Sequence, residues 1–245
     1  MSLGAFAISP KHHQEDGNDI RNVAHDAFED NAPDDLKDAV PKFAVFGVPG
    51  KFYIGLGGTI KLTAGVDAGD PISNPNELVT ADISPVGPGD HTKFQLSAMQ
   101  SSFYLNFVGL PGSDNQIGAF INMNFLNDYV PVLQYAYLKW RGIKAGYDYS
   151  VFSDLGATPP TIDYEGPNAA TAFPVPTVNY TYRFGKNKAW SATAGLELSQ
   201  LSQTNSARSR TVSQGAPDIP VALEYSWNNT QDWVRLSAVL RNMNY

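Results

Sequence analysis

The residue types that could carry covalent or metal chemistry are few and scattered. The four histidines are His12, His13, His25 and His91, and the sequence has no cysteine. Neither a G-x-S-x-G nucleophile elbow nor an H-E-x-x-H zinc motif occurs. The adjacent pair His12 and His13 lies in a charged stretch, where solvated side chains are the simpler explanation. We therefore expect neither catalysis nor a metal or cofactor.

Charged residues at alternate positions along several segments indicate a different role. They predict strands with one face in contact with water. In 234–241, Arg235 and Arg241 occur at odd positions, whereas the even positions are Val, Leu, Ala and Leu. The same period of two recurs in 54–66, 117–126, 190–198 and 221–227. Period-two alternation is typical of a β-strand with faces of opposite character.

One face of these strands carries Arg, Lys and Glu, which do not suit a dry core. Such a face requires either an outer solvent or a water-filled lumen. We predict that eight charged side chains line a lumen. They are Lys61, Lys144, Asp148, Arg183, Glu197, Glu224, Arg235 and Arg241. Two roles stay open for the cations: to create a field across the lumen, or to pair with neighbouring carboxylates.

The composition fits an envelope β-protein. The 245 residues carry a net charge of -7, and without a basic stripe a nucleic-acid partner is not expected. Absence of cysteine suits a compartment exposed to oxidation. Residues 1–42 are charged and mostly acidic, and we predict a helical or flexible extension there. Residues 43–245 are predicted to form the β-domain.

The connections between the predicted strands alternate between long and short, apart from 127–131. Long connections are expected at 67–93, 151–176 and 199–219. Membrane barrels keep short turns on one side and long loops on the other. All four tryptophans flank the short turns, as expected for an interfacial aromatic girdle. We count nine strands from Phe52 onward, the last one running outward, and expect further strands to be needed for closure.

The sequence resembles the DcaP-like trimeric porins of the Gram-negative outer membrane. The resemblance lies in IGLGGTIKLTAGVD (54–67), MQSSFYLNF (99–107) and LQYAYLKWRGIKAGYDYSVFSDLGATPPTIDYEGP (133–167), with a weaker echo in 219–245. It implies an antiparallel transmembrane β-barrel of roughly sixteen strands, of which this chain would be the N-terminal portion. It also implies a homotrimer in outer-membrane lipid that takes up small hydrophilic solutes, anions among them.

Two departures from the family pattern affect these expectations. Residues 1–42 show no sustained heptads, although members often carry a periplasmic coiled coil at this place. Where the family tends to have a Ser-Arg pair, this chain has Ser101 and Ser102. One lumen cation is therefore absent, which weakens the expected preference for anions.

The resemblance also assigns a role to the long connection 151–176. In trimeric porins the third outer loop folds into the channel and sets its narrowest radius. Its prolines would stiffen such a loop, and the predicted constriction residues are Asp154, Asp163, Tyr164 and Glu165. Loop acids can also bind a cation, but they are more often solvated.

A soluble all-β binding or adhesion module is the alternative function. Both architectures give half-apolar strands. The soluble module would place Ile54, Leu62, Ile121 and Leu236 in a dry core, whereas the porin would turn them toward lipid.

Overall fold

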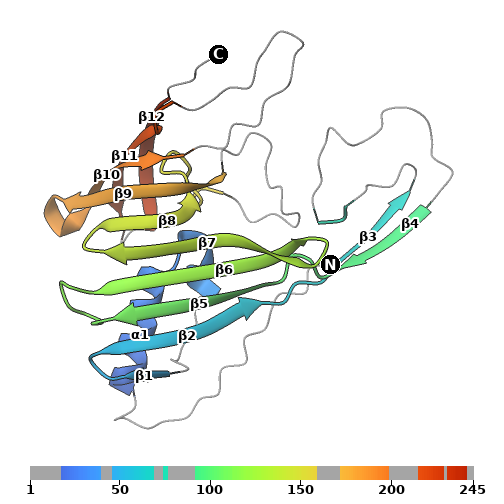
Figure 1. The fold of residues 1–245 in the computed structure, drawn as a ribbon, viewed down its shortest axis with the longest axis horizontal. Coiled ribbons are helices and arrows are strands. Elements are labelled where there is room, and N and C mark those ends of the chain that lie inside the picture. The colour runs from blue at the N-terminus through green and yellow to red at the C-terminus, as the bar shows by residue number, and fades with distance from the viewer. Residues whose placement is uncertain are drawn as a thin grey trace.

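A computed structural model describes residues 18–39, 46–68, 74–76, 92–158, 172–198, 215–228 and 231–241. Its main element is one antiparallel sheet of ten strands, in which each strand pairs with its neighbours along the sheet (Figure 1). The strands, in sheet order, are β1 (Phe46–Val48), β2 (Phe52–Thr59), β5 (Ser102–Gly109), β6 (Ile117–Asn127), β7 (Val130–Trp140), β8 (Ile143–Tyr149), β9 (Pro174–Phe184), β10 (Trp190–Glu197), β11 (Ile219–Trp227) and β12 (Asp232–Leu240). Among the described residues the sheet is open, with β1 and β12 at its edges.

The nine strands predicted from Phe52 onward are present, and β1 adds a tenth to the sheet. Two of the predicted strands, 52–66 and 94–107, are interrupted, and this part of the prediction was wrong. Their outer halves form a separate hairpin of β3 (Thr63–Ala68) and β4 (Thr92–Ser97). The strand pairing is interrupted at Ser101. Its amide donates to the Ala98 carbonyl at 3.0 Å, and its hydroxyl accepts from the Lys61 amide at 3.2 Å.

The short connections lie together at one end of the sheet. β7 and β8 are joined by Arg141 and Gly142, with φ of 48° and 83°, the left-handed conformations that a two-residue hairpin turn needs. A short 3-10 turn at Lys186–Lys188 joins β9 to β10. At the other end, the short predicted connection 127–131 is a two-residue turn at Asp128 and Tyr129.

The apolar residues of the alternating strands lie on an exposed face. Leu236 of β12 is 74% exposed, and Leu62, in the break between β2 and β3, is 65% exposed. Their neighbours on the same apolar rows are also exposed: Leu56, Leu105, Ile117, Ile121, Leu138, Val178, Leu196, Val221, Leu223, Val234 and Leu240. We call this surface the apolar face. Within the described residues, no second sheet packs on it.

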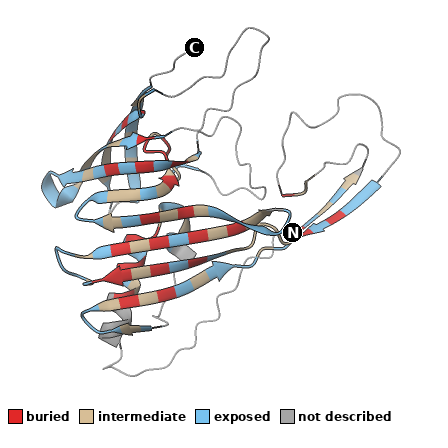
Figure 2. Ribbon diagram, in the orientation of Figure 1, coloured by how far each residue is buried: buried red, intermediate tan, exposed pale blue. Residues whose placement is uncertain are grey.

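The opposite face of the sheet is polar and partly covered. Helix α1 (Asn18–Asn31) and the 3-10 helix η1 (Asp34–Ala39) precede the strands, and α1 contacts β5 and β6 (Figure 1). The buried residues in Figure 2 fall at alternate positions along β5 to β7, as expected when only one face is covered. None of the described helices is long and apolar enough to cross a membrane.

The sheet curves around this polar face. The Ser237 hydroxyl of β12 donates to the Phe152 carbonyl at 2.9 Å, while Leu155 packs against the buried cluster, to which Tyr135 and Tyr137 of β7 belong. On a flat sheet β7 and β12 would lie roughly 24 Å apart. Three residues of chain span at most roughly 11 Å, and strand side chains stand across the sheet rather than along it, so the strands bend toward one another. The polar face is therefore the concave face.

Candidate functional site

The concave face is continuous from β6 to β12, because directly paired residues point to the same side of a sheet. Successive partners across the strands are Phe120, Tyr137, Gly146, Thr177 and Glu197. Along β10, Ser191 has the same parity as Glu197, and it pairs with Glu224, which pairs with Arg235. The predicted lumen residues on β8 to β12 therefore share one surface.

Glu197 is the centre of this surface. Its side chain is 2% exposed, and its two carboxylate oxygens hold the segment that follows β8. The Ser150 hydroxyl donates to Oε2 and the Val151 amide to Oε1, both at 2.7 Å. Hydrogen bonds to an ionised acceptor are about twice as strong as neutral ones. Glu197 therefore fixes the start of the predicted constriction loop on the concave face.

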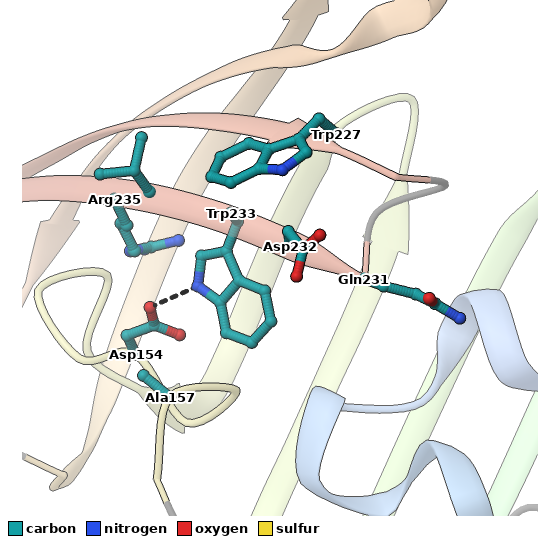
Figure 3. Close-up of a pocket in the computed structure, with 8 residues that line it drawn as sticks. Asp154, Ala157, Trp227, Gln231, Asp232, Trp233 and Arg235 are labelled. Atoms are coloured by element: carbon teal, nitrogen blue, oxygen red, sulfur yellow. Dashed lines mark hydrogen bonds between the residues drawn. The ribbon is translucent and has the colours of Figure 1, made fainter.

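Strand β12 holds the next residues of the same segment. Arg235 donates from Nη2 to the Val151 carbonyl at 2.8 Å and from Nη1 to Glu224 at 3.0 Å. The indole Nε1 of Trp233 donates to the Asp154 carboxylate at 2.9 Å (Figure 3). The first part of the loop is thus folded back across the concave face rather than away from the sheet.

The other predicted wall charges also lie in ion pairs. Lys144 pairs with Asp148, four residues further along β8, and its ammonium lies 5.3 Å from the centre of the Tyr137 ring. Arg241 pairs through Nε with the buried Asp218 at 2.8 Å. With the Arg235–Glu224 pair, three of the predicted cations are paired with acids of the same face. This matches the alternative in which the cations pair with neighbouring carboxylates.

The remaining predicted residues have no described ion pair, lie beyond the sheet or lie outside the described residues. Arg183 is exposed near the end of β9 and pairs with Ser191, so it lies on the concave face. Lys61 lies in the break between β2 and β3, beyond the ten-stranded sheet. Asp163, Tyr164 and Glu165 lie outside the described residues. No group of three or more metal-binding side chains occurs among the residues that the structure describes.

A hollow of about 490 Å³ lies beside the Trp233 and Asp154 contact, at the end of β11 and β12 (Figure 3). Its lining includes Trp227, Asp232 and Arg235. Trp233 belongs to the concave face with Arg235, so it does not join the expected girdle. The other three tryptophans are exposed at the short-turn ends, as expected: Trp140, Trp190 and Trp227.

Several residues of this face were missed from the sequence. Asp218 immediately precedes β11 and pairs with Arg241, 23 residues further along the chain, and no local pattern reveals such a contact. Ser150 and Ser237 are small polar residues that could have been solvated equally well. The aromatic residues Tyr53, Tyr104, Tyr135 and Tyr137 are also on the concave face, in the buried cluster, and a departure from clean alternation was their only signal.

No protein-family model matches the chain, and no curated protein matches it in sequence. In structure it is similar to the outer membrane channel DcaP of Acinetobacter baumannii, with a TM-score of 0.68 and 18% sequence identity. The match covers 82% of this chain and 56% of that channel. The chain thus spans little more than half the length of its structural neighbour, and the likeness shows that its antiparallel sheet has the fold of part of a β-barrel.

Proposed function

We propose that this protein is a porin of a Gram-negative outer membrane. Small hydrophilic solutes, anions among them, diffuse passively through the water-filled space on the concave side of the sheet. The observation that carries this proposal is the separation of the two faces: the apolar face is exposed over nine or more strands, while the charged face is concave. An exposed apolar surface of that extent is expected to meet lipid rather than water.

The soluble binding module is the weaker candidate. It would require the apolar rows to form a dry core, yet Leu62, Ile121 and Leu236 are exposed. Their contact with water would cost about 25 cal/mol for each Å² of apolar surface. Lipid removes this cost without a second sheet.

The segment 150–158 is proposed to narrow the channel. Support for this comes from Glu197, Arg235 and Trp233, which hold its backbone and its Asp154 side chain on the concave face. The wall cations are partly neutralised by this arrangement, so we expect the preference for anions to be modest. Residues 159–171 of the same connection lie outside the described residues.

The assembly is proposed to be a homotrimer, with residues 1–42 as an extension and 43–245 as the barrel domain. This part of the proposal rests on the family resemblance. The mass of the purified protein in detergent, measured by light scattering with the detergent subtracted, tests it. A monomeric mass would contradict it.

Conductance in planar lipid bilayers tests the channel itself. We expect discrete steps in KCl from the folded protein, and none after heat unfolding. Swelling of liposomes in small sugars would give the size limit. A protein that inserts, keeps its β-signal in circular dichroism and yet conducts no ions would overturn the proposal.

A further inference from the structure

Helix α1 is seated on the concave face by a stripe of buried side chains. Ala24, Ala27 and Phe28 are all buried, and Phe28 has no exposed surface. They form one cluster with Tyr104 and Phe120, whose rings stack with centroids 5.4 Å apart. Small residues beside one large aromatic residue let the helix axis approach the strands closely.

Asn31 then fixes the end of the helix. It is 2% exposed, and its amide Nδ2 donates to the Asn106 side chain at 2.7 Å and to the Ala119 carbonyl at 3.1 Å. In return, Asn106 donates to the Phe28 carbonyl at 2.9 Å. Breaking such a buried amide network leaves unsatisfied polar groups, which is costly. The helix is therefore docked in one defined position.

The last carbonyls of α1 are satisfied by the sheet rather than by water. The Tyr137 hydroxyl donates to the Asn31 carbonyl at 2.8 Å, and Lys139 donates from Nζ to the Asp30 carbonyl. A cation at a helix C-terminus also interacts favourably with the helix dipole. Beyond the helix, the Tyr135 hydroxyl donates to Asp35 of η1 at 2.7 Å. Helix, turn and η1 are thus all attached to β7.

The sheet is shaped to receive this segment. Gly118 of β6 lies under Asn31, and a Cβ at this position would come within 1.9 Å of the Asn31 Oδ1 atom. The backbone of Gly118 is an ordinary strand, so the glycine is needed for close approach rather than for conformation. The absence of a side chain here is a specific fit between the sheet and the helix.

We infer that residues 18–39 form a plug that permanently occupies part of the channel and limits the size of the solutes that pass. This inference rests on the proposed porin function, because only then is the concave side a channel. A helix with its side chains is about 10–12 Å across, enough to close a large share of a pore. Buried anchors at Phe28 and Asn31 argue for a fixed plug rather than a mobile gate.

The plug and the loop segment 150–158 form one inner layer. Leu36 of η1 and Leu155 of the loop both pack against the buried cluster. Solutes would therefore pass a constriction that two segments far apart in the sequence build together. Loss of the plug should also loosen the loop.

Two substitutions test the plug from its two sides. Gly118→Ala places a methyl group under Asn31, and Asn31→Ala removes the anchor from the helix. Gly65→Ala, in β3, is the matched control, because a Cβ there meets nothing within 4 Å. The measurements are single-channel conductance in KCl and amide hydrogen exchange of residues 24–31, both on the intact protein in lipid.

We expect the wild type and Gly65→Ala to protect these amides and to conduct alike. Gly118→Ala and Asn31→Ala should lose the protection and conduct about twofold or more, since a structure about 10 Å wide has left the pore. If the variants lose protection of these amides but conduct as the wild type does, the plug is overturned and the porin function stands. Unprotected amides in the wild type would have the same consequence. Protection retained in both variants would also overturn the plug. No conductance from any variant with a released helix would instead overturn the porin function.

Discussion

The attachment of segment 150–158 to Glu197 predicts a graded response to substitution. Both oxygens of this buried carboxylate are used, one by the Ser150 hydroxyl and one by the Val151 amide, each at 2.7 Å. Glu197→Ala removes both acceptors. Glu197→Gln keeps one carbonyl oxygen for the Val151 amide but loses the charge. The backbone pairing of residue 197 with Asp218 is unaffected by either change, so the sheet is expected to persist.

The magnitude follows from the two bonds. Hydrogen bonds to a charged group contribute about 1.5–3 kcal/mol each, so Glu197→Ala should weaken docking of the segment by at least about 3 kcal/mol. Each 1.4 kcal/mol is tenfold in an equilibrium constant. The open population should then rise about a hundredfold in Glu197→Ala and about tenfold in Glu197→Gln.

Amide hydrogen exchange measures this opening, because exchange rates follow the population of the open state. Peptides covering residues 150–158 should exchange faster by these factors, while peptides from β6 stay unchanged. Glu29→Ala is the control, since Glu29 is exposed on α1 and makes no described contact with the segment. Equal exchange of 150–158 in Glu197→Ala and in the parent protein would refute the assignment of Glu197 as the anchor.

Three further predictions concern the plug and the apolar face. Burial raises the pKa of Asp35 above its ordinary 3.8 despite the Tyr135 hydrogen bond, so its contribution to docking is present at low pH and is lost as the pH rises through the raised value. Desolvation would also raise the pKa of Asp34, but the ion pair with Lys37 outweighs it and the pKa is lowered, so that contribution is lost as the pH falls through the lowered value. In Asp35→Asn the protection of residues 24–31 should no longer fall as the pH rises, and in Asp34→Asn it should no longer fall as the pH drops. Unchanged profiles would contradict this. Leu236→Arg should lower the free energy of unfolding in lipid by about 2–4 kcal/mol for a position near mid-bilayer, measured by urea unfolding from liposomes. Ser237→Ala, on the other face, should cost far less. A soluble module would tolerate both substitutions. Asp26 and Glu29 are exposed on the side of α1 away from the sheet, without a partner among the described residues, so Asp26→Asn with Glu29→Gln should move the reversal potential in a KCl gradient toward anions; no shift would place these carboxylates outside the conducting path.

The strand order and the direction of the side chains were readable from the sequence because they depend on local pattern. A strand has a period of two, so Leu236 and Arg235 had to point to opposite faces once β12 was recognised. The two-residue turn at Arg141 and Gly142 was equally local, since glycine adopts a left-handed backbone conformation without strain. What surrounds each face depends on contacts between distant residues, and a pattern of short range does not contain that information.

The partners of the charged residues illustrate the limit. Alternation placed Arg235 and Glu197 on the polar side, but it could not tell that Arg235 holds the Val151 carbonyl or that Glu197 takes two donors from the loop. The residue type alone does not show whether a glutamate is solvated or accepts hydrogen bonds from buried donors. For Glu197 this depends on how segment 150–158 folds against the sheet.

Strands β5 and β7 alternate less cleanly than β10 to β12, and both contact the N-terminal segment, which has a physical cause. Where the concave face meets water its residues must be polar, as at Ser191, Glu224 and Arg235. Where α1 covers it, the same face carries Tyr104, Phe120 and Tyr137, all buried. Both faces of β5 and β7 then carry apolar residues, one face exposed and one covered by the N-terminal segment, and the period of two fades. Aromatic residues that break the alternation, such as Tyr104 on β5 and Tyr137 on β7, therefore mark where another segment covers the concave face.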